Sequence, residues 1–413
     1  MPATWVENYV RLAFRIERVM QTLHERRFIA CYYGPSVWKA EEEAAPMRSP
    51  ADLLRMAGML GESLAAESLE LRRATFLAKQ LLAMETVCRV LCGETLSLEE
   101  ETSRCFDIRP TWTPEEQFEQ MLALGETLLP GQGSAFDRMQ ALTRRYTLPP
   151  EKSPLVLRFS QKALAEARRR THEIIALPDE EEVSVQTVTN RPGNLAFSRY
   201  LGNYRSRIEF NLDASLDLSR LLEIMSHEGY PGHHVEGVLK ERELYRARGY
   251  VEQSLTLSLA PQSVINEGLA MLAPSMIYIP DEEQAWLAEH IYPIAGIEPL
   301  TVDWDYMRQM FDVTMDAQGN AAFLLHEGRP EQEVRQYLMR HLMITEEEAQ
   351  PMLAYLNIPF NAARVFSYTA GKRLLEPWLA CSDRRTAFAR LLTEALYPSQ
   401  LAEDVPFSAH QTT

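Results

Sequence analysis

The chain has 413 residues, which is enough for one large domain or two ordinary domains with a sizeable core. Its formal net charge of −16, without any basic run, argues against a nucleic acid as the main partner. No stretch approaches the roughly 18–20 apolar residues of a membrane span, the first residues show no signal-peptide pattern, and the five cysteines are scattered. We therefore expect a reduced, cytoplasmic protein without a membrane partner, whose oligomeric state the composition leaves open.

Helical periodicity dominates the N-terminal part of the chain, residues 1–180. Apolar residues at spacings of three and four predict a helix over residues 4–28 and a long helical stretch over residues 50–93. The segment Thr113-Pro114-Glu115-Glu116 is typical of a helix start, because it places a capping hydroxyl, a proline and two acids in the first turn. A further helix is expected over residues 153–176.

The pattern changes to alternation in the middle of the chain. Strands are predicted over residues 183–189 and 207–212, and the segment 190–194 between them is rich in turn formers. Helical spacing then returns and continues almost to the C-terminus. The sequence thus predicts one mainly α domain over residues 1–413, α+β overall, with a small antiparallel β-sheet in its second part, residues 181–413.

The segment Ser226–His234 directly follows a predicted helix and holds three of the nine histidines of the chain. Histidine is the commonest metal ligand in proteins. A His-Glu pair followed by a second histidine is how many zinc hydrolases place two ligands and a general base. Here the residue four positions after His227 is Pro231, which like Gly232 is poor in a helix interior. A break at this point would absorb the unusual spacing.

The break decides which histidine is the second ligand. In an interrupted helix His233 takes the position of the usual second ligand, and this is the arrangement that we favour. His234 is the alternative, since it regains the face of His227 in an unbroken helix, although about 10 Å further along the axis. Glu228 lies about 100° around the helix from His227, so it can act as the general base. A simple helix end capped by histidines is the competing explanation.

Other candidate residues lie downstream of this motif. Glu267, in the short apolar segment 264–270, is the best third ligand, because an acid buried there would otherwise be costly; an exposed helical face is the alternative. Arg364, Tyr368 and Lys372 share one helical face at spacings of four and offer hydrogen-bond donors. Arg364 or Lys372 would bind a substrate carboxylate, unless this face is simply solvated.

Two segments near the predicted sheet are candidates for contact with a peptide. The strand around residues 208–212 would receive an extended peptide by pairing at its edge. The loop 191–205, which includes Tyr204, would line the cleft.

The string His227-Glu228-x-x-Pro231-Gly232-His233 resembles the motif of the bacterial DUF885 family, which is placed among metallopeptidases related to the thermolysin-like (gluzincin) group. Weaker likenesses follow in the expected order, at Glu267-Gly268-Leu269-Ala270 and at Tyr368-x-x-Gly371-Lys372. The resemblance covers most of the chain and implies a zincin-like fold.

The resemblance also implies roles for particular residues. One Zn²⁺ per chain would be held by His227, His233 and Glu267, with Glu228 as the base and Tyr368 as the donor to the oxyanion. Two positions depart from the family pattern. Glu236 stands where many relatives have glutamine, and Leu269 stands where they have tryptophan.

The leading hypothesis is a zinc-dependent peptidase that hydrolyses small or unfolded peptides. The alternative is a non-catalytic helical protein that binds peptides or a partner and whose metal site is structural or lost. Hydrolysis of another amide or ester would use the same chemistry. Glu228 separates the first two hypotheses, because a structural metal site has no use for a base beside an open coordination position.

Overall fold

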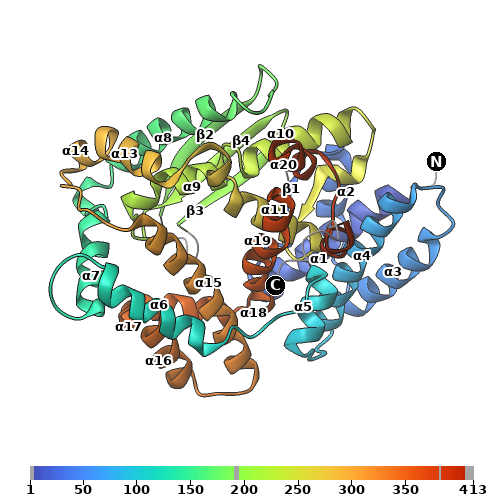
Figure 1. Ribbon diagram of the computed structural model, residues 1–413. Coiled ribbons are helices and arrows are strands. Elements are labelled where there is room, and N and C mark those ends of the chain that lie inside the picture. The colour runs from blue at the N-terminus through green and yellow to red at the C-terminus, as the bar shows by residue number, and fades with distance from the viewer. Residues whose placement is uncertain (1–3, 190–194, 381–382, 405–413) are drawn as a thin grey trace.

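The computed structural model describes residues 4–189, 195–380 and 383–404, and these form a mainly α molecule with two small β-sheets (Figure 1). The predicted mainly α fold class is therefore confirmed. The turn-rich segment 190–194 lies outside the described residues. Within the described ranges, no helix combines the length and the apolarity that crossing a bilayer requires.

The N-terminal part is helical, as its periodicity predicts. The first predicted helix ends earlier than expected, at a residue in the left-handed conformation, Glu25 (φ 51°). The stretch predicted over residues 50–93 is two helices rather than one. The elements of this part are α1 (Trp5–His24), β1 (Ile29–Tyr32), α2 (Ser36–Ala44), α3 (Pro50–Leu64), α4 (Leu71–Leu91), α5 (Leu98–Phe106), α6 (Glu115–Leu128), α7 (Ala135–Tyr146), η1 (Pro150–Lys152) and α8 (Leu155–Thr171).

The larger sheet has the strand order β2–β4–β3, with β2 (Glu182–Val188), β3 (Ala196–Gly202) and β4 (Arg205–Asn211). β3 and β4 form an antiparallel hairpin, and its turn residues Asn203 and Tyr204 both have positive φ, as a type I′ hairpin turn requires. β2 pairs with β4 in parallel. The sheet is therefore mixed and not antiparallel as predicted, because alternation identifies the buried face of a strand but not the direction of its neighbour.

The strand order also corrects the predicted peptide-binding strand. β4 contains most of residues 208–212, and it is the central strand, paired on both sides. Its main-chain groups are thus not available to a peptide. The edge strands β2 and β3 each pair with β4 on one side, so the main-chain groups on their other side take no part in this sheet. A second sheet pairs β1 with β5 (Leu255–Leu257), two segments far apart in the chain that no local pattern brings together.

The larger sheet packs against α8 of the N-terminal part and against the two helices that flank the motif, α9 and α10. Helices of the second half also pack against the N-terminal helices. α6 contacts α15 and α16, and α5 contacts α11 and α18 (Figure 1). The remaining elements are η2 (Leu218–Arg220), α9 (Leu221–Glu228), α10 (His233–Lys240), η3 (Glu241–Arg246), η4 (Val251–Ser254), α11 (Pro261–Leu272), α12 (Pro274–Ile277), α13 (Pro280–His290), α14 (Tyr292–Ala295), α15 (Trp304–His326), α16 (Glu331–Leu342), α17 (Glu346–Leu356), α18 (Asn361–Arg364), α19 (Phe366–Leu379), α20 (Arg384–Thr393) and α21 (Pro398–Asp404).

Helices α11 and α19 touch through their backbones. A Cβ atom added to Gly268 on α11 would lie 2.4 Å from the carbonyl carbon of Gly371 on α19, and one added to Gly371 would lie 2.3 Å from the carbonyl oxygen of Val264. Only glycine leaves room for this approach. The contact brings Glu267 on α11 close to Tyr368 on α19, so that the carboxylate adds to the effect of burial in raising the pKa of the tyrosine.

Gly371→Ala should force these two helices apart. We expect the free energy of unfolding to fall by about 1–3 kcal/mol, as for other overpacked cores, and urea denaturation measures the change. Gly58→Ala in α3 is the matched control, because a Cβ atom there meets nothing within 4 Å, so the change should stabilise the helix by up to about 1 kcal/mol. An unchanged midpoint for Gly371→Ala would show that the contact is dispensable.

Candidate metal centre

The motif helix is interrupted, as its sequence predicts. α9 ends at Glu228 and α10 begins at His233. Between them the chain turns back over the last turn of α9: the N–H of Gly232 donates to the carbonyl of Ser226 at 2.9 Å, and a Cβ atom on Gly232 would lie 2.0 Å from the carbonyl oxygen of His227. Glycine is thus required at this position. The return places the rings of His227 and His233 side by side, with centroids 4.8 Å apart.

Three side chains converge here, His227, His233 and Glu267, which we call the metal triad. The Nε2 atoms of His227 and His233 lie 3.6 Å and 3.7 Å from Oε2 of Glu267, and one donor atom of each residue lies within 4.8 Å of the other two. Zinc binds nitrogen and oxygen at about 2.0–2.2 Å, so two ligand atoms of a tetrahedral site are about 3.3–3.6 Å apart. The donor types suit a zinc ion, and the distances from Glu267 to the two histidines are close to those of a tetrahedral site.

The charges around the triad also favour a cation. Burial raises the pKa of Glu267, but the two histidines and Arg364 outweigh it and hold this pKa well below its usual range. Nη2 of Arg364 lies 3.0 Å from Oε1 of Glu267, while Oε2 faces the histidines. Burial lowers the pKa of His233, whereas Glu236 and Glu267 raise it more strongly, to about 10. A site that draws positive charge onto the half-buried ring of His233 has the negative potential that suits a divalent cation.

Glu236 lies behind His233, on the side away from Glu267. Its Oε2 is 3.9 Å from Nδ1 of His233, and its Oε1 is 2.5 Å from Nζ of Lys240. Carboxylates behind metal-binding histidines orient the ring and increase its basicity. Glu236 stands where the resembled family often has a neutral glutamine, and the ion pair with Lys240 offsets the extra negative charge of the glutamate.

His234 points away from the triad, so the alternative second ligand is wrong. Its side chain is fully buried, with Nε2 2.7 Å from a carboxylate oxygen of Glu181 and Nδ1 2.8 Å from Oγ of Ser206. Glu181 also accepts a hydrogen bond from the hydroxyl of Tyr230 and pairs with Arg168 at 2.6 Å. His234 thus anchors the segment between α9 and α10 to the core.

Replacing the two adjacent histidines should have opposite effects. His233→Ala should abolish zinc binding and change the stability of the zinc-free protein little. His234→Ala should keep zinc binding but lower the free energy of unfolding by about 1–3 kcal/mol, because it leaves buried polar groups without a partner. Zinc per chain is measured by mass spectrometry and stability by urea denaturation. A folded His234→Ala protein without zinc, beside a His233→Ala protein that retains it, would reverse the assignment.

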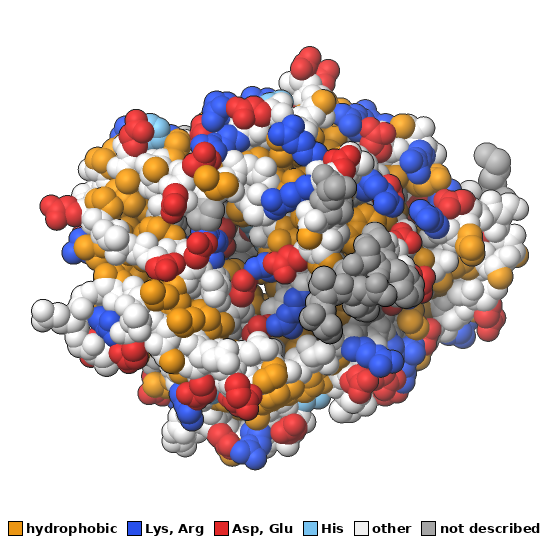
Figure 2. Space-filling model, viewed as in Figure 1, with side chains coloured by type: hydrophobic (Ala, Val, Ile, Leu, Met, Phe, Trp, Pro, Cys, Tyr) orange, Lys and Arg blue, Asp and Glu red, His pale blue; other side chains and the backbone are white. Residues whose placement is uncertain are grey.

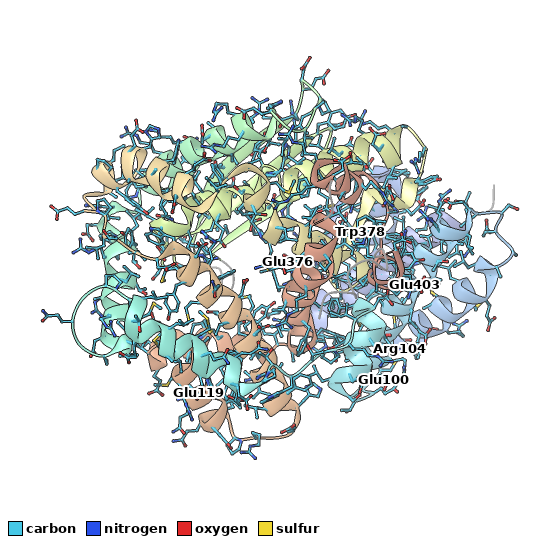
Figure 3. The ribbon with its side chains drawn as sticks, viewed as in Figure 1. Glu100, Arg104, Glu119, Glu376, Trp378 and Glu403 are labelled. Atoms are coloured by element: carbon cyan, nitrogen blue, oxygen red, sulfur yellow. The ribbon has the colours of Figure 1, made fainter. Side chains whose placement is uncertain are left out.

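The triad opens onto a cavity of about 1660 Å³, which is larger than the roughly 300–1,000 Å³ of typical small-molecule pockets. Figure 2 shows the molecule hollowed near the centre of one face, where acidic and basic side chains meet. Glu376 of α19 points toward this hollow (Figure 3) and lines the cavity. The cavity has room for several residues of an extended chain.

Glu228 and Tyr368, the two predicted catalytic residues, both line this cavity. The carboxylate of Glu228 accepts a hydrogen bond from the main-chain N–H of Ser198 at 2.7 Å. Ser198 belongs to the edge strand β3, which lies within the segment 191–205 that the sequence predicted as a loop lining the cleft. Desolvation raises the pKa of Tyr368 well above its usual value, so its hydroxyl keeps its proton and is able to donate.

The predicted substrate-binding residues have other partners. Lys372 lines the cavity, but Nζ pairs with Asp312 at 2.6 Å, and Arg364 is held by the triad glutamate. Tyr204 does not line the cavity and lies at the β3–β4 turn, with the guanidinium of Arg246 4.8 Å from its ring centre. Its predicted role is therefore wrong, since sequence position does not tell which end of a hairpin faces the motif.

Comparison with known proteins gives a likeness of fold. No protein-family model and no curated protein sequence matches the chain. Among solved structures, a "putative lipoprotein from Colwellia psychrerythraea" is similar with a TM-score of 0.53 and 14% identity, over 86% of this chain and 66% of that one. A "putative lipoprotein of unknown function from Shewanella oneidensis" has a TM-score of 0.48 and 11% identity, over 88% and 74% of the two chains. The chain spans about two thirds of the length of the first protein, and at this identity the likeness concerns the fold alone.

Proposed function

We propose that the protein is a zinc-dependent peptidase that hydrolyses small or unfolded peptides, of the kind that the DUF885 resemblance implies. The observation that carries the proposal is that the metal triad, Glu228 and Tyr368 line one cavity. The cytoplasmic location expected from composition stays a prediction.

Each group of residues in the site has a distinct role in the proposed hydrolysis. His227, His233 and Glu267 would hold one Zn²⁺, which supplies a Lewis acid and lowers the pKa of water. Glu228 accepts a proton from the attacking water at a carboxylate oxygen and later delivers it to the leaving amine. Tyr368 donates its hydroxyl proton in a hydrogen bond to the substrate carbonyl oxygen as this atom gains negative charge.

The edge strand β3 is suited to position the substrate. Leu195, Ala196 and Ser198 line the cavity, and among the described strands β3 is paired with β4 alone. An extended peptide would add to this edge through main-chain hydrogen bonds. The same strand bonds to Glu228 through Ser198, so the substrate would lie next to the base.

A non-catalytic protein with a structural metal site is the competing function. Structural zinc sites are closed by four protein ligands, whereas catalytic sites use three and keep an open position. In the described part of the chain three such ligands converge, and the group has a carboxylate, Glu228, beside it in a cavity. This arrangement favours catalysis. Hydrolysis of another amide or an ester would use the same residues.

Glu228→Gln is the direct test of the peptidase proposal. Because it removes the proton acceptor and no ligand, it should lower kcat by a factor of about 10²–10⁴ while the zinc content stays at one per chain. Turnover of a peptide library is followed by mass spectrometry, with zinc content measured on the same samples.

His227→Ala is the companion variant, and it should lose both zinc and turnover. Removal of zinc from the wild type by a chelator should have the same effect, with activity restored when zinc is returned. Undiminished peptide cleavage by Glu228→Gln, or a wild type that binds no zinc when supplied with it, would refute the proposal.

Tyr368→Phe tests the proposed oxyanion donor. Loss of one such donor costs about 10²–10³ in kcat, and we expect this reduction with KM nearly unchanged, because the hydrogen bond strengthens only as charge develops. Steady-state kinetics on one cleaved peptide gives both constants. A tyrosine that only packs against Arg364 would instead leave kcat near the wild-type value.

A further inference from the structure

Glu283 on α13 is a buried acid that faces the cavity. Its side chain lines the cavity wall although the residue is only 8% exposed. Within the described ranges, no basic side chain forms an ion pair with it at 4.0 Å or less. Burial raises the pKa of this carboxyl to about 7. An acid placed in this way is costly unless it meets a cation.

The basic residues that face Glu283 are already engaged. Arg220 pairs with Glu223 at 2.7 Å, and Arg308 pairs with Asp305. Both arginines attract the carboxylate of Glu283 only from a distance, and Glu223 repels it. The peptide group of Glu223 also favours the ionised form of Glu283, but it has no net charge to balance the carboxylate. This end of the cavity therefore has more acids than bases.

The position of Glu283 relative to the metal triad follows from Glu223. Glu223 precedes His227 by four residues on α9, which is one helical turn or about 6 Å. An extended peptide advances about 3.3–3.6 Å per residue. A substrate group that reaches Glu283 would thus belong to a residue a few positions from the bond that is cleaved.

We propose that Glu283, assisted by Glu223, binds a cationic nitrogen of the substrate close to the cleaved bond. The nitrogen is either the N-terminal ammonium of the peptide or the side chain of a lysine or arginine, since both present the same charged donor. This inference deepens the proposed peptidase function and rests on it.

Equilibrium binding separates this subsite from catalysis. Calorimetry is performed on zinc-loaded Glu228→Gln protein with three probes: tetra-alanine amide with a free N-terminus, its N-acetylated form, and an N-acetylated form in which one alanine is replaced by lysine. Adding Glu283→Gln should weaken the binding of a cationic probe by about 10–100-fold and leave the neutral acetylated probe unchanged. Glu289→Gln, an exposed acid on the same helix, is the matched control and should change neither.

The outcomes identify the source of the cation. If only the probe with a free N-terminus loses affinity, the subsite binds the terminal ammonium. If only the lysine probe loses affinity, the subsite binds a basic side chain. The inference would be overturned if Glu283→Gln weakened the binding of charged and neutral probes equally, or weakened neither. It would also be overturned if no probe bound to the protein in which Glu283 is intact. Charge-dependent binding without hydrolysis by the wild type would refute the peptidase proposal alone, whereas hydrolysis without charge preference would refute the subsite alone.

Discussion

The backbone contact between α11 and α19 is the constraint on which the site depends. Helix axes normally lie about 8–10 Å apart because side chains separate them, and the glycines at 268 and 371 remove those side chains from the contact. The short separation lets Arg364, just before α19, reach the carboxylate of Glu267 at 3.0 Å. Together with the two histidines of the triad, Arg364 offsets the cost of burying the charge of Glu267, which for an isolated charge is several kcal/mol.

Local balance of charge then determines what each end of the cavity suits. Near the triad, Lys240 pairs with Glu236 and Arg364 pairs with one oxygen of Glu267, whose other oxygen faces the two imidazoles. Near α13, the arginines are taken by other acids and Glu283 is left over. The two ends therefore favour different cations, a metal ion with a preference for nitrogen ligands and an organic ammonium or guanidinium group that forms hydrogen bonds.

The features that sequence reasoning predicted are those that depend on local spacing. The helical stretches, the break at Pro231-Gly232 and the favoured His233 all follow from the preferences of neighbouring residues. Glu267 was predicted as the third ligand because an acid buried in an apolar segment is costly unless it has a partner.

The features that were missed depend on partners distant in the chain. The parallel pairing of β2 with β4, the joining of β1 to β5 and the burial of His234 against Glu181 have no local pattern. Glu283 likewise looks like an ordinary acid in the first turn of a helix. Only the fold shows that it faces inward, next to arginines that are already paired.

The carboxylate of Glu181 has a consequence for how the chain can be divided. It joins Arg168 of α8 to Tyr230 and His234 of the motif, so it links the end of the N-terminal helical part to the loop that positions His233. A fragment beginning after α8 would keep every residue of the triad and Glu181 itself, but it would lose Arg168, the cation that balances the charge of Glu181 behind that loop. Cleavage of the chain near residue 175, followed by loss of the N-terminal fragment, would therefore alter the loop that positions His233, although no residue of the triad is removed.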